Sequence, residues 1–552
     1  MDYERMPLLK RVLVSLCMTL LYVLRLLSDY LAFPALSAFK SGRSKLQPRV
    51  DEKILLMSAS DLAEKIRSGE LSSHQVVLAF VKRLREIDPL LNAVTDERYR
   101  AALSEAKKVD AELKECRSDE EALQKIKLQR PYLGVPITTK NALAVKDLGN
   151  EAGLYLKKGT KSPSDSYAIS VMRASGAIPL AVTNTPEMCL WMESNNKLFG
   201  RTSNPYNLYR TCGGSSGGEG AILASCGSPF GIGTDIAGSI RVPAAYNGVF
   251  GLKPTINTVD MTGHYPMPKD ILYPLLIAGP MCKYAKDLRP FLKALVGPET
   301  AKRMNLDSRP SLRKLKVLHL GDFHSSIITP VKKEIAQRTK SAALHLASLS
   351  KSDSQSIVIP KIAHAFEIYM TYMTKAKCPP LAEELAMLKG SISLKRETVK
   401  YLIGRSKHTM PALFVAYLEK LVQNSKDSSL VKDFYRMSLD LQAEVETLLG
   451  EDGILVCPTL PDIAPYHGLT ILRPSILAHT GIWNILGFPA VSVPMGLSKK
   501  GMPIGVTVVA GKFKDNICCE VALELERQFG GWVPPFETSI ENWASLKEQI
   551  LL

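Results

Sequence analysis

The chain contains 552 residues, of which 46% are hydrophobic and 22% are charged, a composition that predicts a folded globular protein and excludes a mainly disordered one. Its formal net charge of +16 is compatible with nucleic acid, an anionic membrane surface or no specific partner, but no zinc finger, RNP motif or arginine-rich block supports nucleic acid. The ten cysteines and nine histidines contain no CxxC or HExxH pattern, so we expect no metal site.

The N-terminal segment is hydrophobic. Residues 12–24, VLVSLCMTLLYVL, form an uncharged, mostly apolar run that is shorter than the ~20 residues a helix needs to span a bilayer. Residues 8–36 would span one if Lys10, Arg11 and Arg25 reach the headgroups. We therefore expect residues 1–36 to be a membrane anchor, single-pass or interfacial, with a signal peptide as the alternative. The basic residues that follow favour a body on the cytoplasmic side without fixing the orientation.

Residues 37–53 are polar and are expected to link the anchor to a body that spans residues 54–552. The body opens with two helical patterns. The first is expected to begin at residue 60 or 61 and to end at Gly69. The second is expected to be capped by Ser72 or Ser73 and to be followed by Pro89.

Five short apolar runs, rich in Val and Ile and bounded by Gly and Pro, are typical of buried strands. They are YLGVPITTK, GAIPLAVTNT, GILVCPTLP, GFPAVSVPMGL and MPIGVTVVAG, and the last precedes a helical pattern, NICCEVALELERQFG. Because strands of this kind alternate with helices, the sequence predicts an α/β fold with helices on both faces of a sheet.

The middle of the body, residues 298–449, is more basic and less regular than the rest, and we interpret it as a variable insert. Within it, residues 398–421 carry apolar groups beside Lys and Arg, with Pro411 as a helix breaker. We interpret this segment as an ordinary core helix; the alternative is an amphipathic surface that dips into a bilayer.

Residues 212–241, CGGSSGGEGAILASCGSPFGIGTDIAGSIR, are rich in glycine and serine, although their flanks are typical of a folded core. A phosphate-binding loop is excluded, because GIGTDI has Ile236 in place of the last glycine and no G-K-[ST] ending is present. The pentapeptide GGSSG matches G-x-S-x-G, which would make Ser215 the nucleophile of an α/β-hydrolase. No histidine has the setting of the third triad member, and His264 and His479 are expected to be surface or core residues.

A third interpretation covers most of the chain. The blocks GGSSGGEGA, GTDIAGSIRVPA and GVFGLKPT resemble the amidase signature family, and LGVPITTKN resembles the segment that carries the lysine of that family. Further blocks match in order: GAIPLAVTNTPEM, SNNKLFGRTSNPYN, NILGFPAVSVPMGL and GMPIGVTVVAG. The resemblance runs from about residue 58 to about residue 526 and is weakest across the middle. Within the family, the chain is most similar to the membrane-bound fatty-acid amide hydrolases of the second type.

The resemblance implies the family's mixed, twisted sheet and a Ser–Ser–Lys triad. Ser239 would be the nucleophile that forms the acyl ester, Ser215 the bridging serine and Lys140 the base. A buried lysine can act as a base because desolvation lowers its pKa. The family also implies a cis peptide bond between Gly214 and Ser215. The implied oxyanion hole consists of the backbone N–H groups of Ile236, Ala237, Gly238 and Ser239, and the implied supporting residues are Ser216, Thr234, Asp235 and Arg241.

Three residues depart from the family pattern. Ala237 replaces a common glycine, Asn141 replaces an acid after the lysine, and Thr507 replaces a frequent glutamine. The methyl group of Ala237 restricts φ, and Asn141 removes a charge near Lys140. None of the three removes a triad member.

The resemblance implies a serine hydrolase that cleaves fatty-acid amides, either primary amides or N-acylethanolamines, and needs no cofactor. The alternatives are a short-chain or xenobiotic amidase, and a catalytically impaired relative that binds lipids. The expected partners are a lipid amide substrate and membrane lipids, and no nucleic acid is expected. Formation of a homodimer is kept as an open alternative.

Overall fold

The computed structural model describes residues 19–20, 22–24, 26–32, 35, 47–350, 354–422 and 428–538. Its centre is an 11-stranded sheet in the order β1-β3-β2-β8-β10-β9-β14-β15-β13-β11-β12. These strands are β1 (Val94–Glu97), β2 (Pro136–Lys140), β3 (Ile178–Thr183), β8 (Phe230–Asp235), β9 (Phe250–Lys253), β10 (Ile277–Cys282), β11 (Lys316–His319), β12 (Gln355–Ser356), β13 (Gly453–Pro458), β14 (Ala490–Leu497) and β15 (Pro503–Ala510). Two small sheets pair β4 (Asn195–Asn196) with β5 (Gly200–Arg201), and β6 (Ser203–Asn204) with β7 (Asn207–Thr211).

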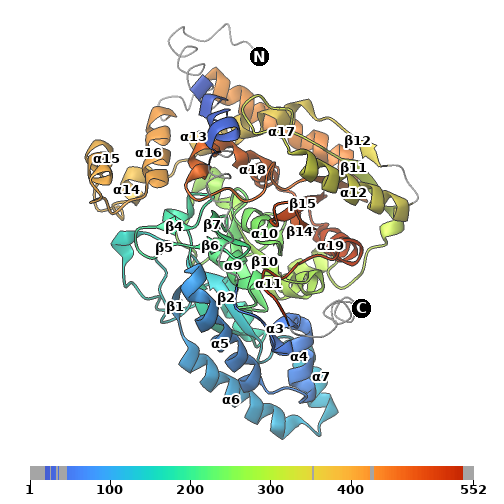
Figure 1. Cartoon of the computed structure of the whole chain (residues 1–552). Helices are drawn as coiled ribbons and strands as arrows, with labels where there is room; N and C mark the ends of the chain where they lie inside the picture. The colour runs from blue at the N-terminus through green and yellow to red at the C-terminus, as the bar shows by residue number, and fades with distance from the viewer. Residues whose placement is uncertain are drawn as a thin grey trace.

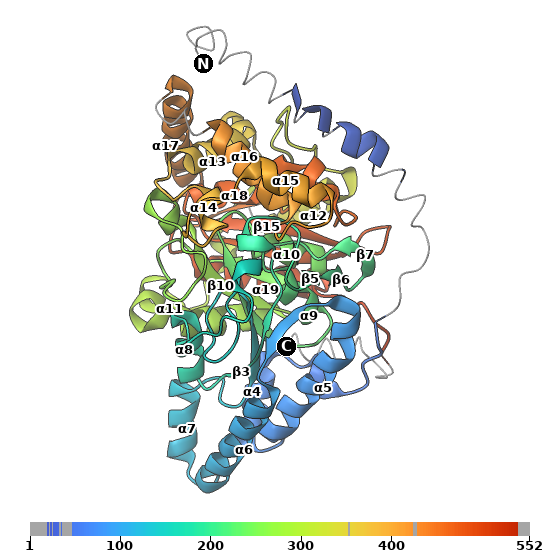
Figure 2. The same cartoon turned by 90° about the vertical axis from the view of Figure 1, so that its left-hand side faces the viewer.

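The helices surround this sheet (Figures 1 and 2). They are α3 (Lys53–Leu56), α4 (Ala59–Ser68), α5 (Ser73–Leu91), α6 (Tyr99–Cys116), α7 (Glu120–Gln129), α8 (Tyr167–Ala174), α9 (Gly217–Ala224), α10 (Arg241–Asn247), α11 (Leu288–Arg303), α12 (Lys333–Ser350), α13 (Ala365–Lys375), α14 (Leu381–Glu384), α15 (Leu394–Leu402), α16 (Met410–Val422), α17 (Ser429–Leu449), α18 (Ala478–Ile485) and α19 (Asp515–Phe529).

The sheet is mixed and buried on both faces. β2 is parallel to β3 and β8, and β11 is parallel to β12 and β13, whereas the other neighbours are antiparallel. Every residue of β2, β3, β8, β10 and β13 is buried, which requires packing on both sides of the strands. The predicted α/β fold, its five strands and its last helix are confirmed.

The first two predicted helices are confirmed as α4 and α5. Ser58 caps α4 by accepting a hydrogen bond from the backbone N–H of the third residue, and Gly69 ends it with φ at 79°. Ser72 caps α5 in the same way. Pro89 was expected beyond the second helix, but it lies inside the last turn of α5. Pro89 deprives α5 of one backbone hydrogen bond, and the helix ends two residues later, at Leu91.

Helices α13–α17 lie at one end of the molecule, opposite α4–α7 (Figures 1 and 2), and whether residues 298–449 are a variable insert stays a prediction. Residues 398–421 form the end of α15 and most of α16. Pro411 was expected to break a helix, but it is the second residue of α16, where its fixed φ favours helix initiation. α16 buries Leu413 in the core, whereas α15 exposes Val399 and Leu402, so the segment is core helix in one half and apolar surface in the other.

The expected anchor at residues 1–36 and linker at residues 37–53 fall largely outside the described residues. One described part, the π-helical turn Leu27–Ala32, exposes Tyr30 and Leu31. Within the described ranges, every helix is too short or too polar to cross a bilayer.

Candidate active site

Three chain segments bring polar side chains to the same edge of the sheet. β2 ends at Lys140 and its parallel neighbour β8 ends at Asp235, so the carboxyl ends of these two strands meet. Between β7 and α9, the chain brings Ser215 to the same place. The Gly214–Ser215 peptide bond is cis, as the family resemblance implies.

Lys140 occupies the centre of this cluster and is only 1% exposed. Its Nζ lies 2.5 Å from the Oγ of Ser215 and 2.9 Å from the Oγ1 of Thr234. Burial lowers the pKa of Lys140, and this effect outweighs the opposing influence of Cys189 and Asp235. A lysine whose pKa is lowered can lose its proton and then accept one from a neighbouring hydroxyl.

The Thr234 hydroxyl connects Lys140 to a histidine. His264 is buried, and its Nε2 lies 3.1 Å from Thr234 Oγ1, while its Nδ1 lies 2.8 Å from the carbonyl oxygen of Pro266. Burial, together with the nearby Lys140, lowers the pKa of His264 to about 3, so the imidazole is neutral near pH 7.

Ser216 connects the segment that carries Ser215 to the segment that carries Ser239. Its backbone N–H donates to the carbonyl oxygen of Ser239 over 3.0 Å, and its Oγ accepts from the N–H of Thr234 over 3.3 Å. The side chain and the backbone of Ser216 therefore hold the start of α9 against the end of β8 and the turn that follows it.

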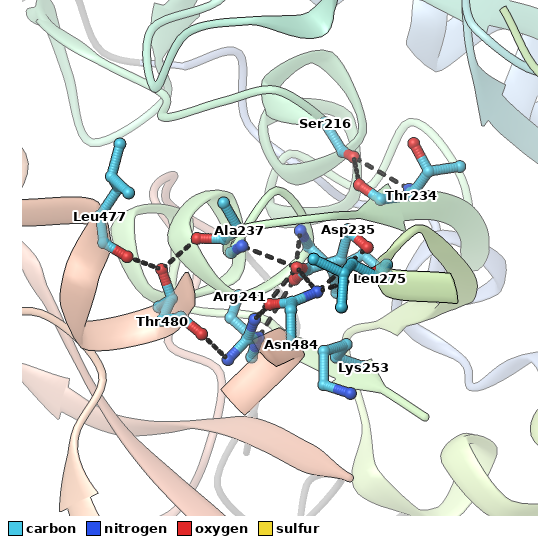
Figure 3. Close-up of polar contacts among 12 residues, drawn as sticks. Ser216, Thr234, Asp235, Ala237, Arg241, Lys253, Leu275, Leu477, Thr480 and Asn484 are labelled. Carbon is cyan, nitrogen blue, oxygen red and sulfur yellow. Dashed lines mark hydrogen bonds and ion pairs between the residues drawn. The ribbon is translucent and has the colours of Figure 1, made fainter. Parts of the chain in front are cut away.

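Asp235 and Arg241 form a buried ion pair beside the cluster (Figure 3). Arg241 donates to both carboxylate oxygens of Asp235, over 3.0 and 3.1 Å, and the backbone N–H groups of Gly238 and Ile240 donate over 2.6 and 3.1 Å. Asn484 donates to the same carboxylate and accepts from Arg241. Burial raises the pKa of Asp235, but the charge and hydrogen bonds of Arg241 prevail and hold it at about 2. The pair is therefore ionised and fixes the turn between β8 and α10.

The residues of this turn, 236–239, line the cavity. Among the described residues, the N–H groups of Ile236, Ala237 and Ser239 donate no hydrogen bond. The N–H of Gly238, which the resemblance places in the oxyanion hole, is instead taken by Asp235. Three backbone donors of the turn therefore remain without an acceptor in the described structure.

The structure accommodates the three departures from the family pattern. Ala237 has no positive φ, so its methyl group causes no backbone strain, and its carbonyl oxygen accepts from the Thr480 hydroxyl over 2.6 Å. Asn141 donates to Glu151 and Thr95 and accepts from two backbone N–H groups. Thr507 donates to the hydroxyl of a neighbouring threonine.

A cavity of about 290 Å³ opens at this cluster. Its polar end contains Lys140, Ser215, Ser239, Thr234 and His264. Away from that end, the lining is mostly apolar and comes from α13, α16 and the loops that face them: Met188, Leu190, Trp191, Met192, Ile236, Met267, Leu272, Phe366, Tyr369, Met370, Met373, Phe414, Val415, Leu418, Val422 and Leu477. A cavity of this kind suits a ligand with one polar group and a long apolar tail.

The start of α16 is joined to the loop beside Lys140. The Glu187 carboxylate accepts from the backbone N–H and the hydroxyl of Thr409, over 2.7 and 2.9 Å, and lies 2.7 Å from Nδ1 of His408. Glu187 is buried and immediately precedes Met188 and Cys189, which line the cavity. A helix of the cavity wall and the neighbourhood of the lysine therefore share one anchoring carboxylate.

Several residues that contact the site are marked by no sequence pattern. Thr480 and Asn484 come from α18, and only Asn484 falls within a block that resembles the family. His264 was interpreted as a surface or core residue, and its contact with Thr234 depends on a loop far along the chain. No local pattern marks these contacts, because they arise only when distant segments pack together.

The sequence pattern of the Amidase family matches residues 75–519. Fatty-acid amide hydrolase 2-B of Danio rerio is 40% identical over 92% of this chain and 96% of its own length. Fatty-acid amide hydrolase 2 of Homo sapiens is 35% identical over 93% of this chain and 98% of its own length. The solved structure of 6-aminohexanoate cyclic dimer hydrolase with substrate has a TM-score of 0.67 at 24% identity, covers 90% of this chain and 100% of its own, and supports the same fold.

Proposed function

Since this chain belongs to the amidase family and is an amide-hydrolysing enzyme, we propose that it cleaves long-chain fatty-acid amides through an acyl ester on Ser239. The observation that carries the proposal is the 2.5 Å contact between Lys140 and Ser215 at the polar end of a mostly apolar cavity. The cavity would hold the acyl tail, and the polar end would act on the amide carbonyl.

Lys140 acts as the base through Ser215. A serine hydroxyl is a weak nucleophile and needs a base within hydrogen-bond reach. As Ser239 attacks the carbonyl carbon, its proton passes to Ser215, and the proton of Ser215 passes to neutral Lys140. The new C–O bond leaves a negative charge on the former carbonyl oxygen, which the N–H groups of Ile236, Ala237 and Ser239 stabilise. Each such donor contributes ~3 kcal/mol to the stability of the transition state.

The same proton path serves the leaving group. When the tetrahedral intermediate collapses, the C–N bond breaks and Ser215 protonates the departing amine, while Lys140 returns its proton to Ser215. Ser239 then carries the fatty acyl ester. A water molecule attacks this ester with its proton passing along the same route, and release of the fatty acid restores Ser239 and neutral Lys140.

We also propose that the enzyme works at a membrane surface, where its lipid substrate resides. Apolar side chains are exposed on α15 and just beyond it, including Leu402 at 75% and Ile403 at 60%. Tyr30 and Leu31 are exposed as well, and their segment lies toward the same end of the molecule (Figures 1 and 2). An exposed apolar surface near the cavity helices supports contact with lipid.

The test is hydrolysis of oleoyl amide and of butyramide by the full chain in detergent, with Ser239→Ala and Lys140→Ala beside the wild type. Ser170→Ala, on the exposed side of α8, is the matched control and should retain full activity. We expect preference for oleoyl amide and loss of activity in both site variants. Turnover of butyramide alone would contradict the fatty-acyl assignment.

A fluorophosphonate probe locates the nucleophile independently of the substrate. Mass spectrometry of the labelled protein should find the adduct on Ser239. An adduct on Ser215 would support the G-x-S-x-G interpretation instead. Absence of any adduct in a folded protein would support the alternative of a catalytically impaired relative that binds lipids.

A further inference from the structure

His264 belongs to a chain of three hydrogen bonds that runs from Lys140 to the carbonyl oxygen of Pro266. Lys140 Nζ lies 2.9 Å from Thr234 Oγ1, Thr234 Oγ1 lies 3.1 Å from His264 Nε2, and His264 Nδ1 lies 2.8 Å from the Pro266 carbonyl oxygen. All three side chains are buried and line the polar end of the cavity.

The direction of each hydrogen bond follows from the last one. A carbonyl oxygen can only accept, so Nδ1 of His264 carries the proton and donates to Pro266. The imidazole is neutral, so its Nε2 has a lone pair and accepts the hydroxyl proton of Thr234. With its single proton committed to His264, Thr234 can only accept from Lys140.

This arrangement decides where the lone pair of neutral Lys140 points. A neutral amine has two N–H groups and one lone pair, and one N–H is directed at Thr234. Without an acceptor at His264, the Thr234 hydroxyl could rotate and donate to the lysine lone pair, in competition with Ser215. We propose that His264 is a positioning residue that keeps Thr234 an acceptor, so that the lone pair of Lys140 stays available to the hydroxyl of Ser215.

The backbone holds His264 in place relative to the lysine. His264 pairs with Leu143 in an antiparallel bridge, the N–H of Ala144 donates to Gly263, and the N–H of Tyr265 donates to Ala142. The loop that follows Lys140 and the loop that carries His264 are therefore hydrogen-bonded to each other. Thr234 is fixed between them at the end of β8.

His264 does not serve as the base itself. Its Nε2 is occupied by Thr234 and its Nδ1 by Pro266, so neither ring nitrogen is free for substrate. The inference rests on the proposed function, because it concerns how the base of that reaction is oriented.

The test compares His264→Phe with His264→Gln in the full chain. Phe keeps the ring but removes the acceptor, whereas Gln can present its Oε1 near the position of Nε2. We expect kcat for oleoyl amide to fall about tenfold or more in His264→Phe. KM should stay within about twofold, since the tail contacts are unchanged. His264→Gln should keep most of the wild-type kcat. Equal loss in both variants, or no loss in His264→Phe, would overturn the inference.

A double-mutant cycle separates orientation from packing. Thr234→Val removes the hydroxyl, so in that background His264→Phe should lower kcat no further, because the competing donor is already absent. If the two substitutions instead lower kcat by factors that multiply in the double variant, His264 has a packing role only and the inference is overturned. Thermal unfolding of each variant, followed by circular dichroism, shows whether the protein is folded. Absence of Ser239-dependent hydrolysis in the wild type would overturn the proposed function, and this inference with it.

Discussion

Gly238 and Thr480 are in such close contact that no side chain fits between them. A Cβ atom added at Gly238 would lie 2.0 Å from the Oγ1 of Thr480, and the φ of Gly238 is +121°. Thr480 also donates to the carbonyl oxygen of Ala237 over 2.6 Å. The turn before Ser239 is therefore closed by α18, and its shape depends on a glycine that donates nothing to substrate.

We predict that Gly238→Ala lowers kcat/KM by about a hundredfold, since a displacement of about 1 Å at the reacting groups has effects of this size. The matched control is Gly390→Ala, where φ is also positive, at +102°, but no atom lies within 4 Å of the added Cβ. This control should lose only about 1 kcal/mol of stability and keep its kcat/KM. Similar activity losses in the two variants would mean that backbone strain, not the clash with Thr480, is responsible.

The acyl tail is predicted to lie along α16. Leu418 of this helix lines the cavity, whereas Leu421 of the same helix is 55% exposed and lies outside the lining. Leu418→Trp should lower kcat/KM for oleoyl amide by about tenfold or more while changing that for a short-chain amide by less than about twofold. Leu421→Trp should leave the ratio of kcat/KM for oleoyl amide to kcat/KM for the short-chain amide unchanged. A chain-length series measured on both variants checks this, and an unchanged ratio in Leu418→Trp would place the tail elsewhere.

The activity of the enzyme should depend on pH through Lys140. Only neutral lysine can accept the proton, and burial lowers its pKa below the ordinary 10.5. Activity is therefore expected to be lost as the pH falls through this lowered pKa and to be retained above it. The pH profile of kcat/KM measures this. His264 cannot produce an acid limb near neutrality, because its pKa is about 3.

The variant Lys140→Arg tests directly whether Lys140 causes the pH dependence of kcat/KM. Arginine keeps the positive charge but does not deprotonate in the accessible range, so the variant should be inactive at every pH. Activity in Lys140→Arg that follows the wild-type profile would show that another group is the base.

The ion pair between Asp235 and Arg241 is predicted to matter for stability as well as for activity. Both side chains are fully buried, so Arg241→Met would leave an uncompensated carboxylate and cost about 3–5 kcal/mol. Arg49→Met removes an exposed partner of Asp51, where both side chains are more than half exposed, and should cost less than about 1 kcal/mol. Denaturant unfolding of both variants gives the comparison.

The contribution of Asp235 also has a defined pH dependence. Its pKa in the folded protein is about 2, below the ordinary 3.8, so its stabilisation is fully present above the ordinary value and is lost as the pH falls through about 2. In Arg241→Met this stabilisation should be absent, and the difference in stability between the wild type and the variant should shrink in strong acid.

Much of this structure follows from local sequence. Valine and isoleucine runs bounded by Gly and Pro become β2, β3, β13, β14 and β15, because buried strands need such residues on both faces. The family resemblance also leads to the contact between Lys140 and Ser215. Pro89 and Pro411 were misplaced because the effect of a proline depends on which turn of a helix contains it.

The remaining features depend on contacts between distant segments. His264 reaches Thr234 only because its loop pairs with the loop that follows β2, and Thr480 meets Gly238 only because α18 packs against the turn after β8. The sequence of either partner alone carries no sign of the other. The N–H of Gly238 was expected to face substrate, yet the nearby Asp235 carboxylate binds it in the folded chain.

The carboxylate of Glu187 joins a helix of the cavity wall to the loop beside Lys140. It binds Thr409, the residue before α16, while its chain neighbours Met188 and Cys189 line the same cavity as Lys140. A tail that pushes α16 outward would therefore also shift the surroundings of the lysine. By reciprocity, a proton on Lys140 would then change the affinity for the tail by the same factor, so we expect acyl chain length and pH to have coupled effects on activity.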